Sequence, residues 1–331
     1  MSDFRQDISD YCERIGNDLN LVQGAGGNVS WKEAETGIMW IKASGTWLSE
    51  ANQKNIFVPV DFAALAAAIR SKDYSTAPSV LQGQELRPSI ETILHGIMPH
   101  KVVSHTHMRG ALKYLVQSKA HEALTQLLPS DLSWTTVDYA KPGPDLGALV
   151  HAEIQKRPAD IVFLKNHGVI VGAESIEQVE NLYARLDEAL KVSNPDDGFN
   201  STGSELQNYE LEATADYHML GLNETIFSKI NAAWALYPDH IVFLGAEPNV
   251  FDSFDAFKQA SIADPLLYGI VKNNGVYISN SANKNVRAML NFYSWVMFDT
   301  ADIEHYNMLS KEDIAALLNW DAEKYRKSIA K

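Results

Sequence analysis

The stretch that decides the fold is residues 87–109, which read R-P-S-I-E-T-I-L-H-G-I-M-P-H-K-V-V-S-H-T-H-M-R. Pro88 and Ser89 are typical of a helix start, so we expect Glu91 to lie inside the first turn of that helix. Apolar residues at helical spacing continue it. Residues 102–107 then form an apolar run that ends in His-x-His, and this run predicts a short buried strand.

The two histidines that end this strand are candidate metal ligands. Side chains at positions i and i+2 point to the same side of a strand, so His105 and His107 project together, at a separation that one divalent metal ion can bridge. Two imidazoles with a nearby carboxylate are ligands that Zn²⁺, Mn²⁺ or Co²⁺ accepts. The alternative is that both are polar residues on one wet strand face, and the pair alone leaves both interpretations open.

A third histidine lies in a similar setting. Residues 161–172 form a second apolar run, which is interrupted at Asn166-His167-Gly168. A glycine after a histidine inside a β-run suggests a bulge or a close backbone approach. His167 would then complete a three-histidine site with an open coordination position, which is the pattern of catalytic zinc. The alternative is a solvated turn between two short strands.

A glycine-rich turn precedes these motifs. Residues 24–30 read G-A-G-G-N-V-S, and their backbone N–H groups can cradle an anion. Ser44 and Gly45 follow a predicted strand and can add to the same pocket. A glycine cluster before a strand is more often only a turn, so this signal needs the others.

Five separated motifs resemble the class II aldolase/adducin family, also called the fuculose-phosphate aldolase type. In the family's order they are Gly-Gly-Asn-Val-Ser at 26–30, Ser-Gly at 44–45, Pro-Ser-x-Glu at 88–91, His-Thr-His at 105–107 and Lys-Asn-His-Gly at 165–168. The tail of the chain resembles the aldolase part of rhamnulose-phosphate aldolase/dehydrogenase fusions. Two features depart from the family's pattern: Ala25 stands where many members carry a Thr that contacts phosphate, and the interval from Glu91 to His105 is short.

The resemblance implies an α/β fold, namely a three-layer α/β/α domain on a mostly antiparallel sheet. It implies a divalent metal, usually Zn²⁺, on His105, His107 and His167. Glu91 would be the catalytic acid/base, and the family also forms homo-oligomers with sites between subunits. The positions that match the family's phosphate site are Gly27, Asn28, Ser44, Gly45 and Ser89.

Two further residues near these motifs receive a prediction. Tyr139, at the end of a predicted strand, is a candidate proton donor at the pocket edge, although an ordinary strand-end tyrosine is an equal alternative. His95 is predicted to be a surface histidine or a hydrogen-bonded one, without a catalytic role.

Composition limits the classes of protein. The chain has 331 residues, a net charge of −14 and a pI of about 5.1. This acidity disfavours nucleic acid and anionic membrane surfaces as partners. Cys12 is the single cysteine, so an intramolecular disulfide is excluded. The N-terminus lacks a signal-peptide pattern and no apolar run reaches transmembrane length, so we expect a cytoplasmic protein with a small-molecule substrate.

The pattern along the first half predicts alternating strands and helices. Asp61 is expected to cap an alanine-rich helix that ends at Ile69. The predicted strands are 29–32, 38–42, 56–60 and 134–139, and the other predicted helices are 3–19, 109–117, 121–128, 145–155 and 175–192.

The second half echoes the first. Residues 193–198 are the best linker candidate, so we expect a metal-binding domain at 1–195 and a degenerate aldolase-like repeat with a C-terminal helix at 196–331. Lys-Asn-His-Gly at 165–168 recurs as Lys-Asn-Asn-Gly at 272–275, and 99–103 recurs as 238–242. On this alignment the three histidines become Leu244, Ala246 and Asn274, so the copy cannot bind metal. Chance similarity of two buried strands is the alternative.

The site and the resemblance together predict a metal-dependent lyase. Cleaving a carbon–carbon bond beside a hydroxyl leaves an enediolate, whose charge a Lewis-acidic metal stabilises while a carboxylate moves the proton. Aldol cleavage of a small ketose phosphate to dihydroxyacetone phosphate and an aldehyde is our first expectation. The alternatives are 4-epimerisation, dehydration or decarboxylation at the same site, a metal-binding regulatory module, and a scaffold like the adducins.

Overall fold

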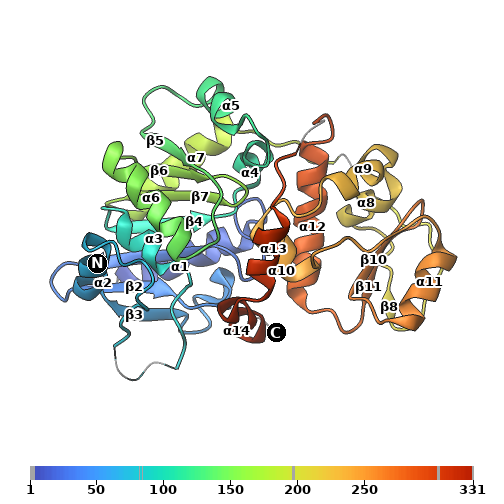
Figure 1. The fold of residues 1–331 in the computed structure, drawn as a ribbon, viewed down its shortest axis with the longest axis horizontal. Helices are drawn as coiled ribbons and strands as arrows, with labels where there is room; N and C mark the ends of the chain where they lie inside the picture. The colour runs from blue at the N-terminus through green and yellow to red at the C-terminus, as the bar shows by residue number, and fades with distance from the viewer. Residues whose placement is uncertain (1–3, 82, 84, 196–197, 304–305, 330–331) are drawn as a thin grey trace.

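The computed structural model describes residues 4–81, 83, 85–195, 198–303 and 306–329. The chain is a mixed α/β protein with two sheets, and a group of helices lies between them (Figure 1). Within these described residues, no helix has both the length and the apolar character needed to cross a bilayer.

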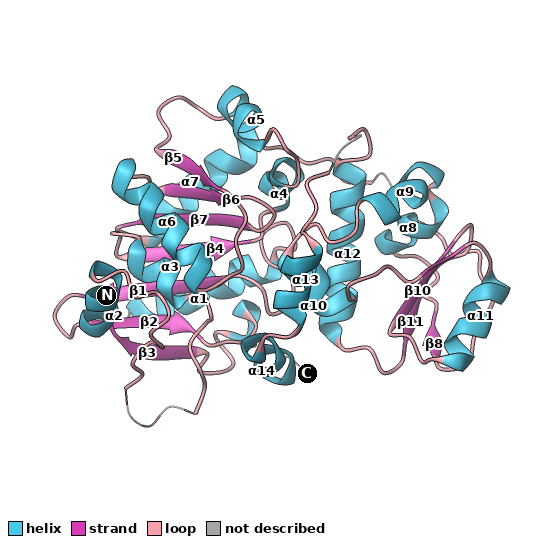
Figure 2. Cartoon of the chain, viewed as in Figure 1, coloured by secondary structure: helices cyan, strands magenta, loops and turns pink. Residues whose placement is uncertain are grey.

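Seven strands form the larger sheet: β1 (Asn28–Glu33), β2 (Ile38–Lys42), β3 (Phe57–Asp61), β4 (Val102–Thr106), β5 (Trp134–Val137), β6 (Ile161–Leu164) and β7 (Gly168–Ala173). Their order is β3-β2-β1-β4-β7-β6-β5 (Figure 2). Neighbours are antiparallel except β5 and β6, which are parallel. The predicted, mostly antiparallel sheet is therefore confirmed.

Helices cover both faces of this sheet, so the first half has three layers. One face carries α2 (Phe62–Arg70), α3 (Thr92–Ile97) and α6 (Pro144–Lys156), and the other carries α1 (Phe4–Asn17), α4 (Arg109–Leu115), α5 (Ala120–Leu127) and α7 (Ile176–Ala189). Strand alternation divides the core: Val103 packs in one cluster with Ile93, and Val102 packs in the other with Leu112.

The elements predicted along the first half are present, and each predicted end lies within three residues of the observed one. Asp61 caps α2 as expected, because its side chain accepts a hydrogen bond from the Ala64 N–H at 2.9 Å. The first residue of the predicted 3–19 helix lies outside the described residues.

Of two local predictions near the histidines, one is wrong and the other is confirmed in one of its two forms. Helix α3 begins at Thr92, so Glu91 is the residue that precedes it and does not lie in its first turn. The interruption at 166–168 is a tight hairpin turn between β6 and β7 and not a bulge, because Asn166 takes a left-handed conformation with φ of 54°. The close backbone approach is real: a Cβ on Gly168 would lie 2.3 Å from the Thr106 carbonyl oxygen.

The second half carries a smaller sheet and most of the remaining helices. Its four strands lie in the order β8-β11-β10-β9. They are β8 (Tyr209–Glu210), β9 (Val250–Phe251), β10 (Tyr268–Val271) and β11 (Gly275–Ser279). The helices are α8 (Met219–Leu222), α9 (Glu224–Lys229), α10 (Pro238–Leu244), α11 (Phe254–Ala263), α12 (Lys284–Asp299), α13 (Lys311–Leu318) and α14 (Asp321–Ile329), and the 3-10 turns of the chain are Leu48–Glu50, Asp216–His218 and Ile230–Ala232.

Part of this second half repeats the order of elements in the first. The series β9-α11-β10-β11-α12 has the same order of strands and helices as the series β5-α6-β6-β7-α7. In each series the first two strands are parallel neighbours and the last two form a hairpin. Both hairpin turns hold a left-handed asparagine, Asn166 and Asn273. Asn274 therefore stands at the turn position of His167.

The other half of the predicted alignment is wrong. Residues 238–244 are helix α10, so Leu244 and Ala246 do not correspond to the strand histidines His105 and His107. The physical reason lies at the ends of this apolar run. Pro238 occupies the first helical turn, and Gly245 leaves the helix with φ of 98°.

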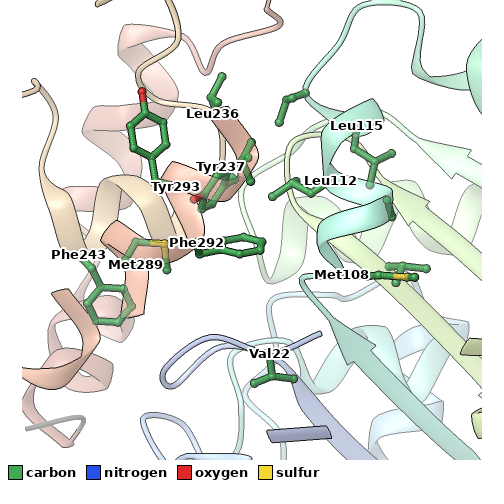
Figure 3. Packing of buried hydrophobic residues seen from close by; sticks show 14 of the residues in the cluster. Val22, Met108, Leu112, Leu115, Leu236, Tyr237, Phe243, Met289, Phe292 and Tyr293 are labelled. Atoms are coloured by element: carbon green, nitrogen blue, oxygen red, sulfur yellow. The ribbon is translucent and has the colours of Figure 1, made fainter. Parts of the chain in front are cut away.

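The two halves share one hydrophobic core. Leu112 and Leu115 of α4 face Tyr237 and Phe292 of the second half across a continuous apolar cluster (Figure 3). The division of the chain at 195 and 196 stays a prediction. Of the predicted linker, residues 196–197 lie outside the described residues.

Candidate metal centre

The sheet brings the three histidines together. His105 lies on β4, His107 follows the end of that strand, and His167 lies in the turn that enters the neighbouring strand β7. The ring centroids are 5.2 Å apart for His105 and His107, 4.9 Å for His105 and His167, and 5.4 Å for His107 and His167. One ring nitrogen of each lies within 4.8 Å of the others, and all three side chains are buried.

The chemistry of these rings fits a divalent metal ion. Among the residues that the structure describes, His105 Nε2, His107 Nδ1 and His167 Nδ1 are buried and have no hydrogen-bond partner. Burial lowers the pKa of His105, and it lowers the pKa of His107 to about 3. Both imidazoles are therefore neutral near pH 7, which is the form that binds metal.

Glu91 faces the same point. Its Oε1 lies 3.2 Å from His167 Nε2 and its Oε2 lies 3.5 Å from His105 Nε2. Oε2 also accepts a hydrogen bond from Asn28 Nδ2 at 2.8 Å. Burial alone would raise the pKa of Glu91, but the two histidines and the Asn28 bond hold that pKa well below its usual range. The carboxylate is thus ionised beside the histidines.

A hydrogen-bonded chain holds Glu91 in place. Asn28 lies opposite His105 in the β1–β4 ladder, so its side chain reaches the same face. Its Oδ1 contacts His95 Nε2, and His95 Nδ1 lies 2.7 Å from Ser30 Oγ. His95 is buried and hydrogen-bonded, as predicted, and its link to Glu91 through Asn28 was not predicted. No local pattern gives this link, because it runs through Asn28 on β1 and Glu91 precedes α3.

A narrow cavity, with about 20 Å³ of free space, adjoins the histidines. This is roughly the space that one ordered water needs. His105 does not line it. The predicted residues that line it are Gly27, Asn28, Ser44, Gly45, Ser89, Glu91, His107 and His167, and Lys42, Asp239, Glu323 and Arg326 also line it without having been predicted.

The predicted backbone cradle for an anion is largely engaged within the chain. The Ala25 N–H donates to Asn285 Oδ1 at 3.1 Å, the Gly26 N–H donates to the Gln23 carbonyl at 3.0 Å, and the Ser44 N–H donates to the Arg87 carbonyl at 2.9 Å. The Ser44 hydroxyl is different, since it is buried and has no hydrogen-bond partner in the described part of the chain. The Ser44 hydroxyl is therefore a better candidate to donate a hydrogen bond to a ligand than the backbone of the glycine turn.

Lys42 places a buried amine at the wall of this cavity. Its Nζ donates to the carbonyls of Ala25 at 3.2 Å and Thr46 at 2.6 Å. Burial lowers its pKa to about 7. Its side chain is nearly inaccessible, and the fraction of the amine that is protonated near pH 7 adds positive potential to the cavity that Ser44 also lines.

Tyr139 does not line the cavity. Its hydroxyl is buried and, within the described residues, has no hydrogen-bond partner. Burial and the Asp313 carboxylate raise its pKa. Its role as a proton donor stays a prediction, and no contact with the cavity supports it.

The C-terminal helix covers the cavity. A Cβ on Gly45 would lie 2.7 Å from Ile329 Cβ and 2.8 Å from the Arg326 carbonyl oxygen. The Arg87 guanidinium stacks over the Tyr325 ring, 4.4 Å from its centroid. Figure 1 shows α14, in dark red, beside the larger sheet. Helix α14 therefore forms part of the wall of this cavity.

Comparison with known proteins gives one curated relative and several solved structures. The chain is 26% identical over 178 residues to the uncharacterized oxidoreductase YuxG of Bacillus subtilis (strain 168), which covers 49% of this chain and 25% of that protein. The chain thus spans about a quarter of the length of that relative.

The solved structures cover slightly more than half of this chain. The N-terminal class II aldolase domain of a conserved protein from Thermoplasma acidophilum is 22% identical, covers 57% of this chain and 92% of its own, and has a TM-score of 0.48. An L-fuculose 1-phosphate aldolase is 21% identical, covers 59% of this chain and 92% of its own, and has a TM-score of 0.41. A sugar-phosphate aldolase from Thermotoga maritima is 18% identical, covers 58% of this chain and 97% of its own, and has a TM-score of 0.44.

The family model described as the class II aldolase and adducin N-terminal domain matches residues 6–193. This match covers more than half of the chain and contains Glu91 and all three histidines. The protein therefore belongs to the class II aldolase and adducin family.

Proposed function

We propose that this protein is a metal-dependent aldolase that cleaves a small ketose phosphate to dihydroxyacetone phosphate and an aldehyde. One observation carries the proposal: three buried imidazoles converge on one point, and an ionised carboxylate faces it. A purely structural histidine cluster would have its ring nitrogens hydrogen-bonded, since unpaired buried polar atoms are costly.

His105, His107 and His167 are the residues that would hold the metal, and we propose Zn²⁺. When bound there, such an ion supplies Lewis-acid stabilisation of negative charge on the substrate oxygens. His105 is already oriented for this, because its Nδ1 donates to the Val169 carbonyl at 3.0 Å and leaves Nε2 free.

Glu91 is the residue we propose for proton transfer. It accepts the proton of the substrate hydroxyl as the adjacent carbon–carbon bond breaks, and it returns that proton to the three-carbon fragment. The hydrogen bond from Asn28 restricts the rotation of its carboxylate. A fixed base close to the reacting atoms reduces the entropic part of the barrier.

The substrate phosphate is proposed to lie near Ser44, Gly45 and Ser89. The unpaired Ser44 hydroxyl and the buried Lys42 amine, which is partly protonated near pH 7, support an anionic group in this region. Because the cavity is narrow, this group can enter only when α14 moves away from Gly45.

The same residues also suit 4-epimerisation, dehydration or decarboxylation, since each needs a stabilised oxyanion and a proton carrier. A panel of ketose phosphates separates them: aldol cleavage releases an aldehyde and dihydroxyacetone phosphate together, epimerisation releases neither, and decarboxylation releases carbon dioxide. The test uses full-length protein loaded with Zn²⁺, and the His105→Ala, His107→Ala double variant is the control. Turnover with other products would replace the aldolase assignment, and metal binding without any turnover would favour a regulatory module. A wild-type chain without metal or turnover would favour a scaffold.

A further inference from the structure

Asp239, from the second half of the chain, faces the metal centre. It lies in the first turn of α10, and its side chain is almost fully buried. Its Oδ2 is 3.5 Å from His107 Nδ1. The separation equals that between Glu91 Oε2 and His105 Nε2. A carboxylate from the second half therefore approaches the one histidine that Glu91 does not contact.

His107 lacks the support that His105 has. His105 Nδ1 donates to a backbone carbonyl, whereas His107 Nδ1 has no hydrogen-bond partner within the described residues. Gly26 limits the ring on one side, because a Cβ there would lie 2.9 Å from both Cε1 and Nδ1 of His107. Metal-binding histidines generally donate their second N–H to a carboxylate or carbonyl, which fixes the tautomer and the ring orientation. Asp239 is the carboxylate placed for that task, because it faces Nδ1 of His107 and leaves Nε2 of the same ring as the nitrogen that would bind the metal ion.

Arg326 holds Asp239 in turn. The guanidinium of Arg326, on α14, reaches both carboxylate oxygens, with Nη1 at 2.5 Å from Oδ1 and Nη2 at 2.8 Å from Oδ2. Both partners are buried, and a paired fork of this kind restricts the carboxylate to one plane. Of the two oxygens held in this way, Oδ2 is the one that lies 3.5 Å from His107 Nδ1.

A purely structural salt bridge is the competing explanation, and the chain offers a matched example. Arg109 and Asp299 form a second buried pair between the two halves, with Nε 2.6 Å from Oδ2 and Nη2 3.0 Å from Oδ1. Asp299 does not line the cavity and contacts none of the three histidines within the described residues. The two pairs share burial and geometry, so they differ mainly in whether a histidine of the metal centre is in reach.

We propose that Asp239 is a positioning residue of the metal centre: its carboxylate fixes the imidazole of His107, and Arg326 fixes the carboxylate. The inference rests on the proposed metal and adds that the second half completes the site. The family match ends at residue 193, so this contribution lies outside the matched domain.

The test compares full-length wild type with Asp239→Asn and Asp299→Asn. Zn²⁺ affinity is measured by competition with a chromophoric chelator, and the visible absorption of bound Co²⁺ reports the ligand geometry. We expect Asp239→Asn to weaken metal binding by roughly 10- to 100-fold and to shift the Co²⁺ bands. Asp299→Asn should keep wild-type affinity and spectrum, and thermal unfolding of the metal-free proteins shows how much each change costs the fold.

A second variant covers the case in which Asp239→Asn does not fold. The triple variant Asp239→Leu, Glu323→Gln, Arg326→Met removes all three buried charges, because Arg326 also lies 3.5 Å from Glu323. Replacing a whole buried ion cluster by uncharged groups is often neutral for stability. A positioning role predicts the same loss of metal affinity in this folded protein. Wild-type affinity and an unchanged Co²⁺ spectrum in either variant would overturn the inference while leaving the proposed function intact. A wild-type chain that binds no metal would instead overturn the proposed function and this inference with it.

Discussion

Replacing Glu91 by glutamine tests the chemistry most directly. Glutamine keeps the size of the side chain, and its carbonyl can still accept the 2.8 Å hydrogen bond from Asn28 Nδ2. It cannot act as a base near neutral pH. The three histidines remain, so the metal should stay bound.

The expected size of the effect follows from the role assigned to Glu91. General acid–base catalysis contributes roughly 10²–10⁴-fold, so kcat should fall by that factor, or by about 3–5 kcal/mol of barrier. KM should change less, because the phosphate is expected to bind at Ser44 and Ser89. The loss should be found in kcat at full metal occupancy.

The assay is steady-state kinetics on metal-loaded protein, with Glu33→Gln as the control. Glu33 ends the same strand that Asn28 begins, so the control removes one carboxylate from the same sheet at a distance from the histidines. Full metal occupancy with near wild-type kcat in Glu91→Gln would refute the reasoning. Loss of metal together with activity would show that Glu91 is mainly a ligand.

Three further predictions concern metal, packing and the buried thiol. Protein purified without chelator should hold about one equivalent of transition metal by elemental analysis, and unchanged content in His105→Ala, His107→Ala would contradict the assignment. Gly45→Ala should cost about 1–3 kcal/mol and speed proteolysis near the C-terminus, because φ is 82° there and a Cβ would meet Ile329; an unchanged cleavage rate would argue against the packing of α14. Cys12 is fully buried and burial raises its thiol pKa, so a thiol reagent at pH 8 should label it only after unfolding in urea; rapid labelling of native protein would contradict its burial.

The metal centre was predictable because its parts obey local rules. The i, i+2 spacing of His105 and His107 placed them together, and the glycine after His167 signalled the close backbone approach that the hairpin turn makes. Glu91 followed from its position one motif upstream. Helix α3 begins at Thr92 and not near Pro88 and Ser89 as predicted, but this did not alter the outcome, because Glu91 still reaches both His105 and His167.

The second half was less predictable for two physical reasons. The periodicity of an apolar run as short as 238–244 fits a buried strand and a buried helix equally well. Here Pro238, in the first turn, favours the helix. Asp239 and Arg326 come from elements that no local pattern relates to the histidines, since they meet only when α10 and α14 pack together. Long-range ion pairs of this kind are a property of the assembled fold.

The cover that α14 places over the cavity bears on when a metal ion can enter during synthesis. His167, the last of the three histidines, leaves the ribosome about 160 residues before Arg326. At common elongation rates this gives roughly 8–30 s in which the histidine strands exist without their cover. Metal capture by the nascent chain would then precede closure, and the finished protein would exchange its ion only as fast as α14 opens. Metal supplied during expression should therefore be retained better than metal added to the folded protein.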